Sequence, residues 1–442
     1  MDLEAQKAWC SSLQRCTKQQ LIDSVAAVEP ILMAGKSATI LAAPVFLTNE
    51  KMTSFTAAAQ SIVDAAVAIE SHESFVAGNV LYDRLYRSLS TKGKLLVDRS
   101  QRVDPVTIAR RFRRLDGYVA ASGRPAFIEM NQSAPLAISF YQRARQFSQL
   151  LSQQTNGQLG RSADLYRDLA QWFVQDLQQL SRKNTWNVAV SMERGYPAKF
   201  VDLPAACDGI AAEAQRMGYK INFILAEPTA FRFKDGVASV DGQSFDLLWR
   251  NTVYLQNYDE VLTEYESIRY GDTPMVNDLQ SWLFRSKEFF AMIWDDSLVD
   301  VFRAVGVDSI ALRVAVPESI SIRAMDATRD RSDWILKRCD DGFGRGIVFG
   351  SECDQQTWQN YCSGHFGDDW IAQRLVDPET IELPVVDTTG EIHDREFICD
   401  FNPYVVAGVV SGILVRALPA HGSASRKMNI VEGAAIGFAS RI

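Results

Sequence analysis

The sequence predicts an α+β protein with a smaller α/β unit in its middle, and three patterns lead to that fold class. Apolar residues recur at helical spacing through most of residues 1–100 and again over 138–182. Between Pro105 and Pro135 the pattern changes to an alternation of period two, which is typical of strands. A strand–helix–strand rhythm begins near Asn187, which indicates a small α/β layer with a parallel pair of strands.

The individual elements follow from the local spacing. Residues 52–69 and 165–180 have the apolar periodicity of amphipathic helices. In the middle unit a helix is predicted over 204–217, and Gly218 ends it because glycine suits the left-handed position after a helix. The strands predicted around that helix are residues 188–190, 221–225 and 245–248.

The last part of the chain is helical from Pro274 and then rich in strands. The strand candidates are residues 334–338, 347–350, 370–376, 395–400 and 412–417. We therefore expect three parts, with boundaries at 1–186, 187–275 and 276–442.

Charge and composition exclude several classes of protein. Lys and Arg number 46 against 54 Asp and Glu, so a net charge of −8 argues against a nucleic-acid-binding surface as the main function. No apolar run approaches the length of a membrane span, and the first residues, Met1 to Glu4, lack the pattern of a signal peptide. Seven scattered cysteines without a CxxC pair suggest reduced thiols. We expect a cytoplasmic protein, and the sequence leaves a homodimer open.

A predicted hairpin gathers four polar residues on one face. If Ser122-Gly123 is a two-residue loop, Asp116 lies opposite Glu129 and Arg114 lies opposite Asn131. The other face then carries Leu115, Ile128 and Met130. Two facing carboxylates repel unless a positive group lies between them, and carboxylate and amide oxygens are ligands that Mg²⁺ prefers. The alternative is a solvated hairpin face with a simple Arg–carboxylate pair.

A second segment joins a lysine strand to a glycine-rich turn. Lys337 ends one strand, and Gly342, Gly344 and Gly346 precede the next. Glycines let backbone N–H groups approach phosphate oxygens, and the lysine adds a fixed cation. The segment is neither a Walker P-loop nor a Rossmann fingerprint, because a strand rather than a helix follows it. A mobile turn without a ligand is the alternative.

Two further segments are less specific alone. The strand Trp370 to Val376 has the composition of a core strand, but its backbone can also face an adenine edge. Arg416 at the end of a predicted strand and Asn429 before a small-residue turn suit contacts with an anion or a substrate.

In this order, the four segments together resemble a circularly permuted ATP-grasp ligase of the glutathionylspermidine synthetase and eukaryotic-type glutathione synthetase groups. Glu129-Met-Asn131 precedes the nucleotide lysines here, whereas it follows them in ordinary ATP-grasp enzymes. The resemblance covers most of residues 105–440 and only weakly the first hundred. It implies an ATP-grasp fold in permuted order, with residues 187–275 as an inserted Rossmann-like α/β substrate domain.

The resemblance also implies roles for individual residues. The metal ligands that it implies are Asp116, Glu129 and Asn131. The nucleotide residues are Lys287, Lys337, Asp341, Gly342, Gly344, Gly346, Gln373, Arg374 and Leu375. The substrate residues are Ser133, Arg250, Arg416, Ala434 and Ala435. Arg114, Lys337 and Arg416 are the implied catalytic cations, with Arg114 at the transferred phosphoryl group.

The function implied is an ATP- and Mg²⁺-dependent ligase that joins a small carboxylate, an amino acid or peptide, to an amine. Two departures from the family pattern bear on this: Asp340 and Asp341 compete for the role of the acidic residue before the lid, which is the glycine-rich segment 342–350, and Glu432 replaces a glycine. A phosphotransferase on the same scaffold and a binding-only protein are the alternatives.

Overall fold

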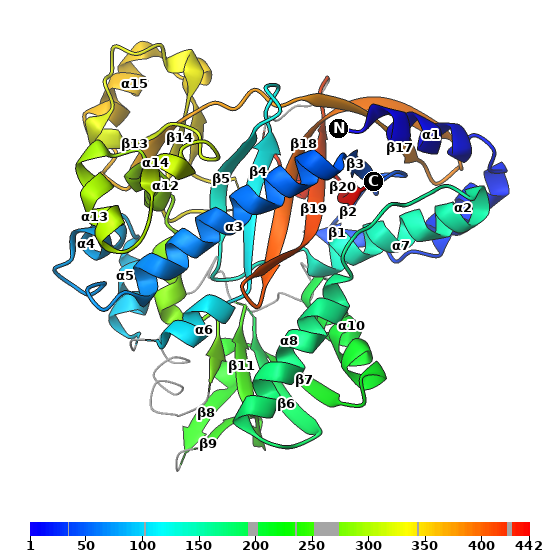
Figure 1. Ribbon diagram of the computed structural model, residues 1–442, viewed down its shortest axis with the longest axis horizontal. Helices are drawn as coiled ribbons and strands as arrows, with labels where there is room; N and C mark the ends of the chain where they lie inside the picture. Colours follow the sequence, from blue (N-terminus) through cyan, green and yellow to red (C-terminus); the bar gives the residue numbers. More distant parts are fainter. Residues whose placement is uncertain are drawn as a thin grey trace.

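The computed structural model describes residues 1–33, 35–100, 103–192, 202–234, 237–251, 274–342, 344–421 and 427–442. Within these residues the largest sheet has seven strands in the order β3-β20-β19-β18-β4-β5, with β17 paired to β18 (Figure 1). Neighbouring strands are antiparallel except β20 and β3. The strands are β3 (Val45–Leu47), β4 (Arg113–Val119), β5 (Pro125–Asn131), β17 (Thr380–Val386), β18 (Ile392–Val406), β19 (Val409–Pro419) and β20 (Ala435–Arg441).

Helix α3 (Asn49–Ser71) crosses one face of this sheet (Figure 1). Its Phe55 ring lies 4.8 Å from the ring of Phe127 and 5.7 Å from that of Phe401. By length and apolar content it is the one helix among the described residues that would fit a membrane span. The packing of its apolar side chains into the core over the sheet accounts for that composition.

The opposite face of the sheet is covered by α7 (Ile138–Thr155) and α8 (Leu165–Leu180). Side chains alternate along a strand, so Phe401 and Val415 pack on the α3 side while Tyr404 and Leu414 belong to the core beside α7 and α8. The polar residues Asp116, Asp400 and Arg416 share the parity of this second face. The large sheet therefore presents its polar residues on the side away from α3.

The predicted strand–helix–strand unit is present as a four-stranded parallel sheet in the order β12-β11-β6-β7, at the bottom of Figure 1. Its elements are β6 (Thr185–Ser191), α10 (Asp202–Arg216), β7 (Lys220–Ala226), β11 (Leu247–Arg250) and β12 (Met275–Val276). Gly218 follows α10 with φ of +86°, as the sequence predicts. A small antiparallel sheet adjoins it, made of β8 (Phe231–Lys234), β9 (Val237–Val240) and β10 (Gln243–Ser244). Division of the chain at 187 and 275 stays a prediction.

A second four-stranded sheet, in the order β13-β16-β14-β15, lies at the upper left of Figure 1. Its strands are β13 (Ser319–Ser321), β14 (Trp334–Arg338), β15 (Ile347–Phe349) and β16 (Trp370–Arg374), all antiparallel to their neighbours. The chain reaches this sheet through the 3-10 helix η2 (Leu279–Arg285) and helices α12 (Glu288–Ile293), α13 (Val299–Ala304) and α14 (Ser309–Leu312). Helix α15 (Gln355–Cys362) follows β15.

The first hundred residues are largely helical, as predicted, but three short strands were missed. The helices are α1 (Leu3–Leu13), α2 (Lys18–Ala26), α3, α4 (Val80–Arg87) and α5 (Thr91–Asp98), followed by α6 (Pro105–Arg110). The missed strands are β1 (Ile31–Met33), β2 (Lys36–Ala38) and β3. Each has three residues, which is too short for an alternation to be recognised.

Candidate active site

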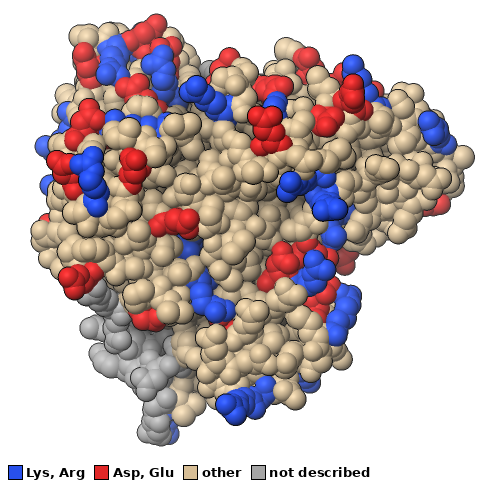
Figure 2. All heavy atoms as spheres, viewed as in Figure 1, with Lys and Arg blue, Asp and Glu red and all other residues tan. Residues whose placement is uncertain are grey.

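A cavity of about 410 Å³ is lined by the polar face of the large sheet and by the strands β14, β15 and β16. Among the described residues, six Lys and Arg line it against four Asp and Glu: Arg114, Arg285, Lys337, Arg374, Arg416 and Lys427, and Asp116, Glu129, Asp202 and Asp400. On the molecular face in Figure 2, by contrast, both signs are interspersed. A cationic cavity in a chain with a net charge of −8 favours an anionic ligand.

The predicted hairpin register is confirmed at the functional positions. Asp116 pairs with Glu129 and Arg114 with Asn131. The turn, however, is one residue longer than predicted, because the Ala120 N–H donates to Arg124 O and Val119 pairs with Pro125. A bulge between Asp116 and Gly117 restores the register toward the site.

The same bulge corrects one prediction. Leu115 and Met130 are buried on the α3 side, as expected. Ile128 lines the cavity instead of joining them, because the extra residue in β5 turns its side chain to the polar face. The floor of the cavity is thus less uniformly polar than the alternation predicts.

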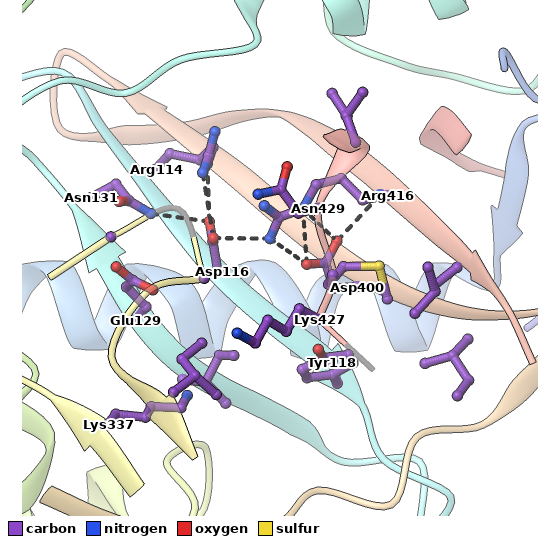
Figure 3. Close-up of a pocket in the computed structure, with 18 of the residues that line it drawn as sticks. Arg114, Asp116, Tyr118, Glu129, Asn131, Lys337, Asp400, Arg416, Lys427 and Asn429 are labelled. Carbon is purple, nitrogen blue, oxygen red and sulfur yellow. Dashed lines mark hydrogen bonds and ion pairs between the residues drawn. The ribbon is translucent and has the colours of Figure 1, made fainter. Parts of the chain in front are cut away.

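Asp116 lies at the centre of a buried network (Figure 3). Its carboxylate accepts hydrogen bonds from Arg114 Nε at 3.0 Å, Asn131 Nδ2 at 3.1 Å and Arg416 Nη2 at 2.9 Å. Burial alone would raise the pKa of Asp116, but Arg114 and Arg416 outweigh burial and hold that pKa below its ordinary value. Asp116 therefore stays ionised and fixes both guanidinium groups.

Asp400 and Asn402 of β18 complete this network, and the sequence did not single out either as a site residue. Arg416 Nε lies 3.1 and 3.0 Å from the two Asp400 oxygens, and Arg416 Nη2 lies 3.1 Å from Asn402 Oδ1. Burial raises the pKa of Asp400, with Arg416 acting against it. Arg416 thus bridges two buried carboxylates, and its position is set by the pairing of β19 with β18 and of β18 with β4.

Both predicted nucleotide lysines approach the hairpin, but of the two only Lys337 is among the described residues that line the cavity. Lys287 Nζ lies 3.1 Å from Glu129 Oε1 and donates to Asp341 O at 2.7 Å. Lys337 Nζ donates to Gln373 Oε1 at 2.7 Å. Burial lowers the pKa of Lys337 to about 7, with Glu129 opposing and Lys287 adding to the shift.

The glycine-rich turn contributes two of its three predicted glycines to the cavity lining, Gly342 and Gly344. Gly344 and Gly346 have φ of +74° and +61°, which favours glycine at both positions. A Cβ at Gly346 would lie 2.7 Å from the Cβ of Arg338, so the hairpin also requires glycine for close packing. Gly346 therefore has a structural reason to be glycine.

The two candidate lid acids have different surroundings. The Asp340 side chain is buried; its Oδ2 accepts from the N–H and hydroxyl of Ser90, and its Oδ1 lies 3.5 Å from Arg285. Asp341 is more exposed, and its Oδ1 lies 3.1 Å from Arg345 Nη2 within the turn. Asp340 thus anchors the end of β14 to the N-terminus of α5, whereas Asp341 belongs to the turn itself.

Gln373, Arg374 and Leu375 are among the residues that line the cavity, where a nucleotide hinge is expected. Their backbone donors are nevertheless engaged elsewhere, because Arg374 N donates to Glu318 O at 2.7 Å and Leu375 N to Asp333 O at 2.8 Å. These two N–H groups are therefore not available to an adenine edge.

Three predicted substrate residues are not among those that line the cavity. Ala434 and Ala435 are buried at the start of β20. Arg250 is fully buried at the end of β11, and its guanidinium donates to Asn277 O at 2.6 Å and to Ser281 Oγ at 3.0 Å. Of the predicted substrate residues, Ser133 and Arg416 do line the cavity. Substrate contact by the other three stays a prediction.

Arg250 instead contacts the segment that leads to Lys287. A buried relay holds this segment from the other side: Arg113 Nε donates to Gln132 Oε1 at 2.9 Å, and Gln132 Nε2 donates to Ser281 O at 2.9 Å. Gln132 directly follows Asn131, so one residue pair ties the acidic hairpin to the lysine segment. This relay links the hairpin to the segment that leads to Lys287.

Sequence reasoning missed several lining residues besides Asp400. Lys427 enters the cavity from the last loop, and Tyr118 from β4 (Figure 3). Asn429, which the sequence predicts to suit contacts with an anion or a substrate, also lines the cavity, and the lysine two residues before it was a usable signal. Tyr118 follows the alternation of β4 from Asp116, so the same pattern could have found it.

The donor set fits Mg²⁺. Glu129 Oε2 and Asn131 Oδ1 accept no hydrogen bond from a described residue, while the oxygens of Asp116 already bind arginines. No group of three or more His, Cys, Asp or Glu able to hold a metal occurs in the described part of the chain. The hairpin thus offers few protein oxygens, which suits Mg²⁺ because this ion usually shares its coordination with phosphates and water.

Comparison with known proteins supports the fold. No protein-family model and no curated protein matches the chain. Its structure is similar to that of a glutathione synthetase-like effector from Globodera pallida in the apo form, with a TM-score of 0.62, 13% identity and coverage of 96% of this chain and 95% of that one.

Two weaker likenesses were also found. A putative gamma-glutamylcysteine synthetase from Methylobacillus flagellatus KT has a TM-score of 0.43 and 10% identity, covering 82% of this chain and 87% of that one. D-alanyl-alanine synthetase A from Vibrio cholerae has a TM-score of 0.27 and 9% identity, covering 50% and 67%. The first likeness, over nearly the whole of both chains, shows that this protein and the effector share a mixed α/β fold.

Proposed function

We propose that this protein is an ATP-dependent carboxylate–amine ligase that forms an acyl phosphate and releases ADP and phosphate. The observation that carries the proposal is the meeting of Lys337 with the hairpin of Asp116, Glu129 and Asn131 at one cationic cavity, with Lys287 paired to Glu129. The shared fold with a glutathione synthetase-like protein is consistent with it. The donor is an amino acid or small peptide, and the acceptor is an amine.

The chain's own residues supply mainly charge and position, which is what phosphoryl transfer requires. Lys337 lines the cavity and is placed to hold phosphate oxygens, and Lys287, paired with Glu129, adds positive charge beside it. Arg114 and Arg416 are held in fixed orientations by Asp116 and Asp400, so their remaining N–H groups are pre-organised for developing negative charge. Bound Mg²⁺, held by Glu129 and Asn131 with Asp116 beside them, would neutralise phosphate charge.

Such a reaction requires no nucleophilic side chain, because the amine attacks the activated carboxylate directly. None of the seven cysteines lines the cavity. Gly342 and Gly344, in the turn between β14 and β15, line the cavity, and this turn would limit the entry of water, which would otherwise hydrolyse an acyl phosphate.

The decisive experiment incubates the full chain with Mg-ATP and pools of amino acids, short peptides and polyamines, then measures ADP and identifies products by mass spectrometry. An amide product with ADP and phosphate, dependent on an amine, would establish the ligase. ADP with a phosphorylated product would identify the phosphotransferase instead. Nucleotide binding without turnover in any pool would favour the binding-only alternative.

A matched pair of variants tests the site. Glu129→Gln keeps the shape of the side chain but removes the charge that faces Lys287, so turnover should fall by at least about a hundredfold. Glu382→Gln on β17 makes the same chemical change at an exposed position and should leave turnover unchanged. Equal activity of both variants would remove Glu129 from the site.

A further inference from the structure

One wall of the cavity is made of hydrocarbon. Met33 of β1, the residues before and within the first turn of α7, and Ile430 in the last loop form this apolar wall: Met33, Ala134, Leu136, Ala137, Phe140 and Ile430. Ala137, Phe140 and Ile430 belong to one core cluster, and Met33 and Leu136 pack against it. The wall is therefore continuous with the core beside α7.

The one acidic residue described beside this wall, Asp202, is hydrogen-bonded to the protein's own backbone. Helix α7 has no side-chain cap of its own; instead, Asp202 Oδ2 accepts from Ala137 N at 2.7 Å and Oδ1 accepts from Ser139 N and Ser139 Oγ at 2.7 and 2.8 Å. Asp202 is 2% exposed. Its carboxylate therefore serves as the cap of α7, and the described residues of the apolar wall then offer no free charge to a polar substituent of a ligand.

The apolar wall adjoins the arginine side chains of the cavity at Leu136. Arg114 Nη1 donates to Leu136 O at 2.8 Å, and Tyr404 Oη donates to the same carbonyl at 2.8 Å. Leu136 thus joins the apolar wall to the guanidinium that also binds Asp116. A molecule whose carboxylate faces Arg114 and Arg416 would place its neighbouring atoms against hydrocarbon.

We infer that the carboxylate donor carries an apolar side chain, and that the apolar wall selects for it over a polar side chain of equal size. This inference rests on the proposed function, because it takes the carboxylate to be the group activated beside Arg114. Of the amino acids and peptides proposed as donors, the inference selects those whose reacting residue has a hydrocarbon side chain.

The experiment compares two ligands of equal charge and nearly equal shape, N-acetyl-leucine and N-acetyl-asparagine. Calorimetry measures the affinity of each for the full chain with Mg²⁺ and a non-hydrolysable ATP analogue, whose own binding is measured first. N-acetyl-leucine should bind at least about tenfold more tightly, because only its side chain gains from leaving water at this wall.

Two variants test whether the apolar wall causes the preference for N-acetyl-leucine. Met33→Gln, which is close in size to the original residue, should lower the affinity for N-acetyl-leucine roughly three- to tenfold and spare that for the ATP analogue. Leu32→Gln changes the neighbouring residue, which is 39% exposed and does not line the cavity, and should change neither affinity. Circular dichroism and melting curves of both variants check that they fold.

Each outcome separates this inference from the proposed function. Equal or tighter binding of N-acetyl-asparagine, binding of neither acid while the ATP analogue binds, or equal effects of the two variants would overturn the apolar subsite. Selective binding of N-acetyl-leucine that Met33→Gln weakens would support the subsite even if the ATP analogue does not bind. In that last case the ligase proposal fails and the subsite stands.

Discussion

Replacement of Lys337 by Met should change stability and nucleotide binding with opposite dependence on pH. Lys337 is buried, and burial lowers the pKa of its amine from 10.5 to about 7, against the attraction of Glu129. Between these two values the unfolded chain binds one more proton at this site than the folded chain. The free energy of unfolding of the wild type therefore rises with pH across this window.

The magnitude follows from the two pKa values. One pKa unit corresponds to about 1.4 kcal/mol, so the wild type should gain about 2–3 kcal/mol relative to Lys337→Met between pH 6 and pH 9. Loss of the hydrogen bond to Gln373 costs the variant about 1–3 kcal/mol. That cost does not depend on pH, so it cancels when the difference between variant and wild type is compared at the two pH values.

The assay is urea unfolding of both proteins at pH 6 and pH 9, with Lys7→Met as the control for loss of an exposed lysine. Binding of an ATP analogue is measured in parallel. The wild type should bind it more tightly as the pH falls toward 7, because a charged amine attracts phosphate, and this dependence should be absent in Lys337→Met. A stability difference that does not change between pH 6 and pH 9, together with unchanged nucleotide affinity, would refute the reasoning.

The remaining predictions concern the supports of the site. Gln132→Met should lower the free energy of unfolding by about 2–4 kcal/mol, because it removes two buried hydrogen bonds; a loss below about 0.5 kcal/mol in urea unfolding would contradict the relay. Gly93→Ala should lower stability by about 1–3 kcal/mol, since its Cβ would lie 2.6 Å from Asp340 Oδ2; an unchanged melting temperature would count against that packing. Asp340→Asn should destabilise the protein more than Asp341→Asn does. The reverse order in urea unfolding would mean that Asp341, and not Asp340, anchors this segment.

The local patterns of the sequence were sufficient for most elements near the site. The predicted lysine strand over 334–338 matches β14, and the helix predicted over 204–217 differs from α10 by two residues at its start and one at its end. The pairing of Asp116 with Glu129 was predicted correctly although the turn length was not, because the bulge compensates for the longer turn. Neither the bulge nor the turned Ile128 has a signature in the order of residues, since both depend on how β5 packs.

The sequence by itself determined that acidic, basic and glycine-rich segments exist with strand periodicity, because side-chain alternation and backbone preference act over a few residues. Only the tertiary structure decided which segments meet. Arg416 reaches Asp116 across a separation of 300 residues, and Asp400 joins them through the pairing of β18 with β4. Arg250 meets the segment before Lys287 instead of the cavity. Such contacts depend on the burial and strand pairing of distant parts of the chain, which no local pattern of residues records.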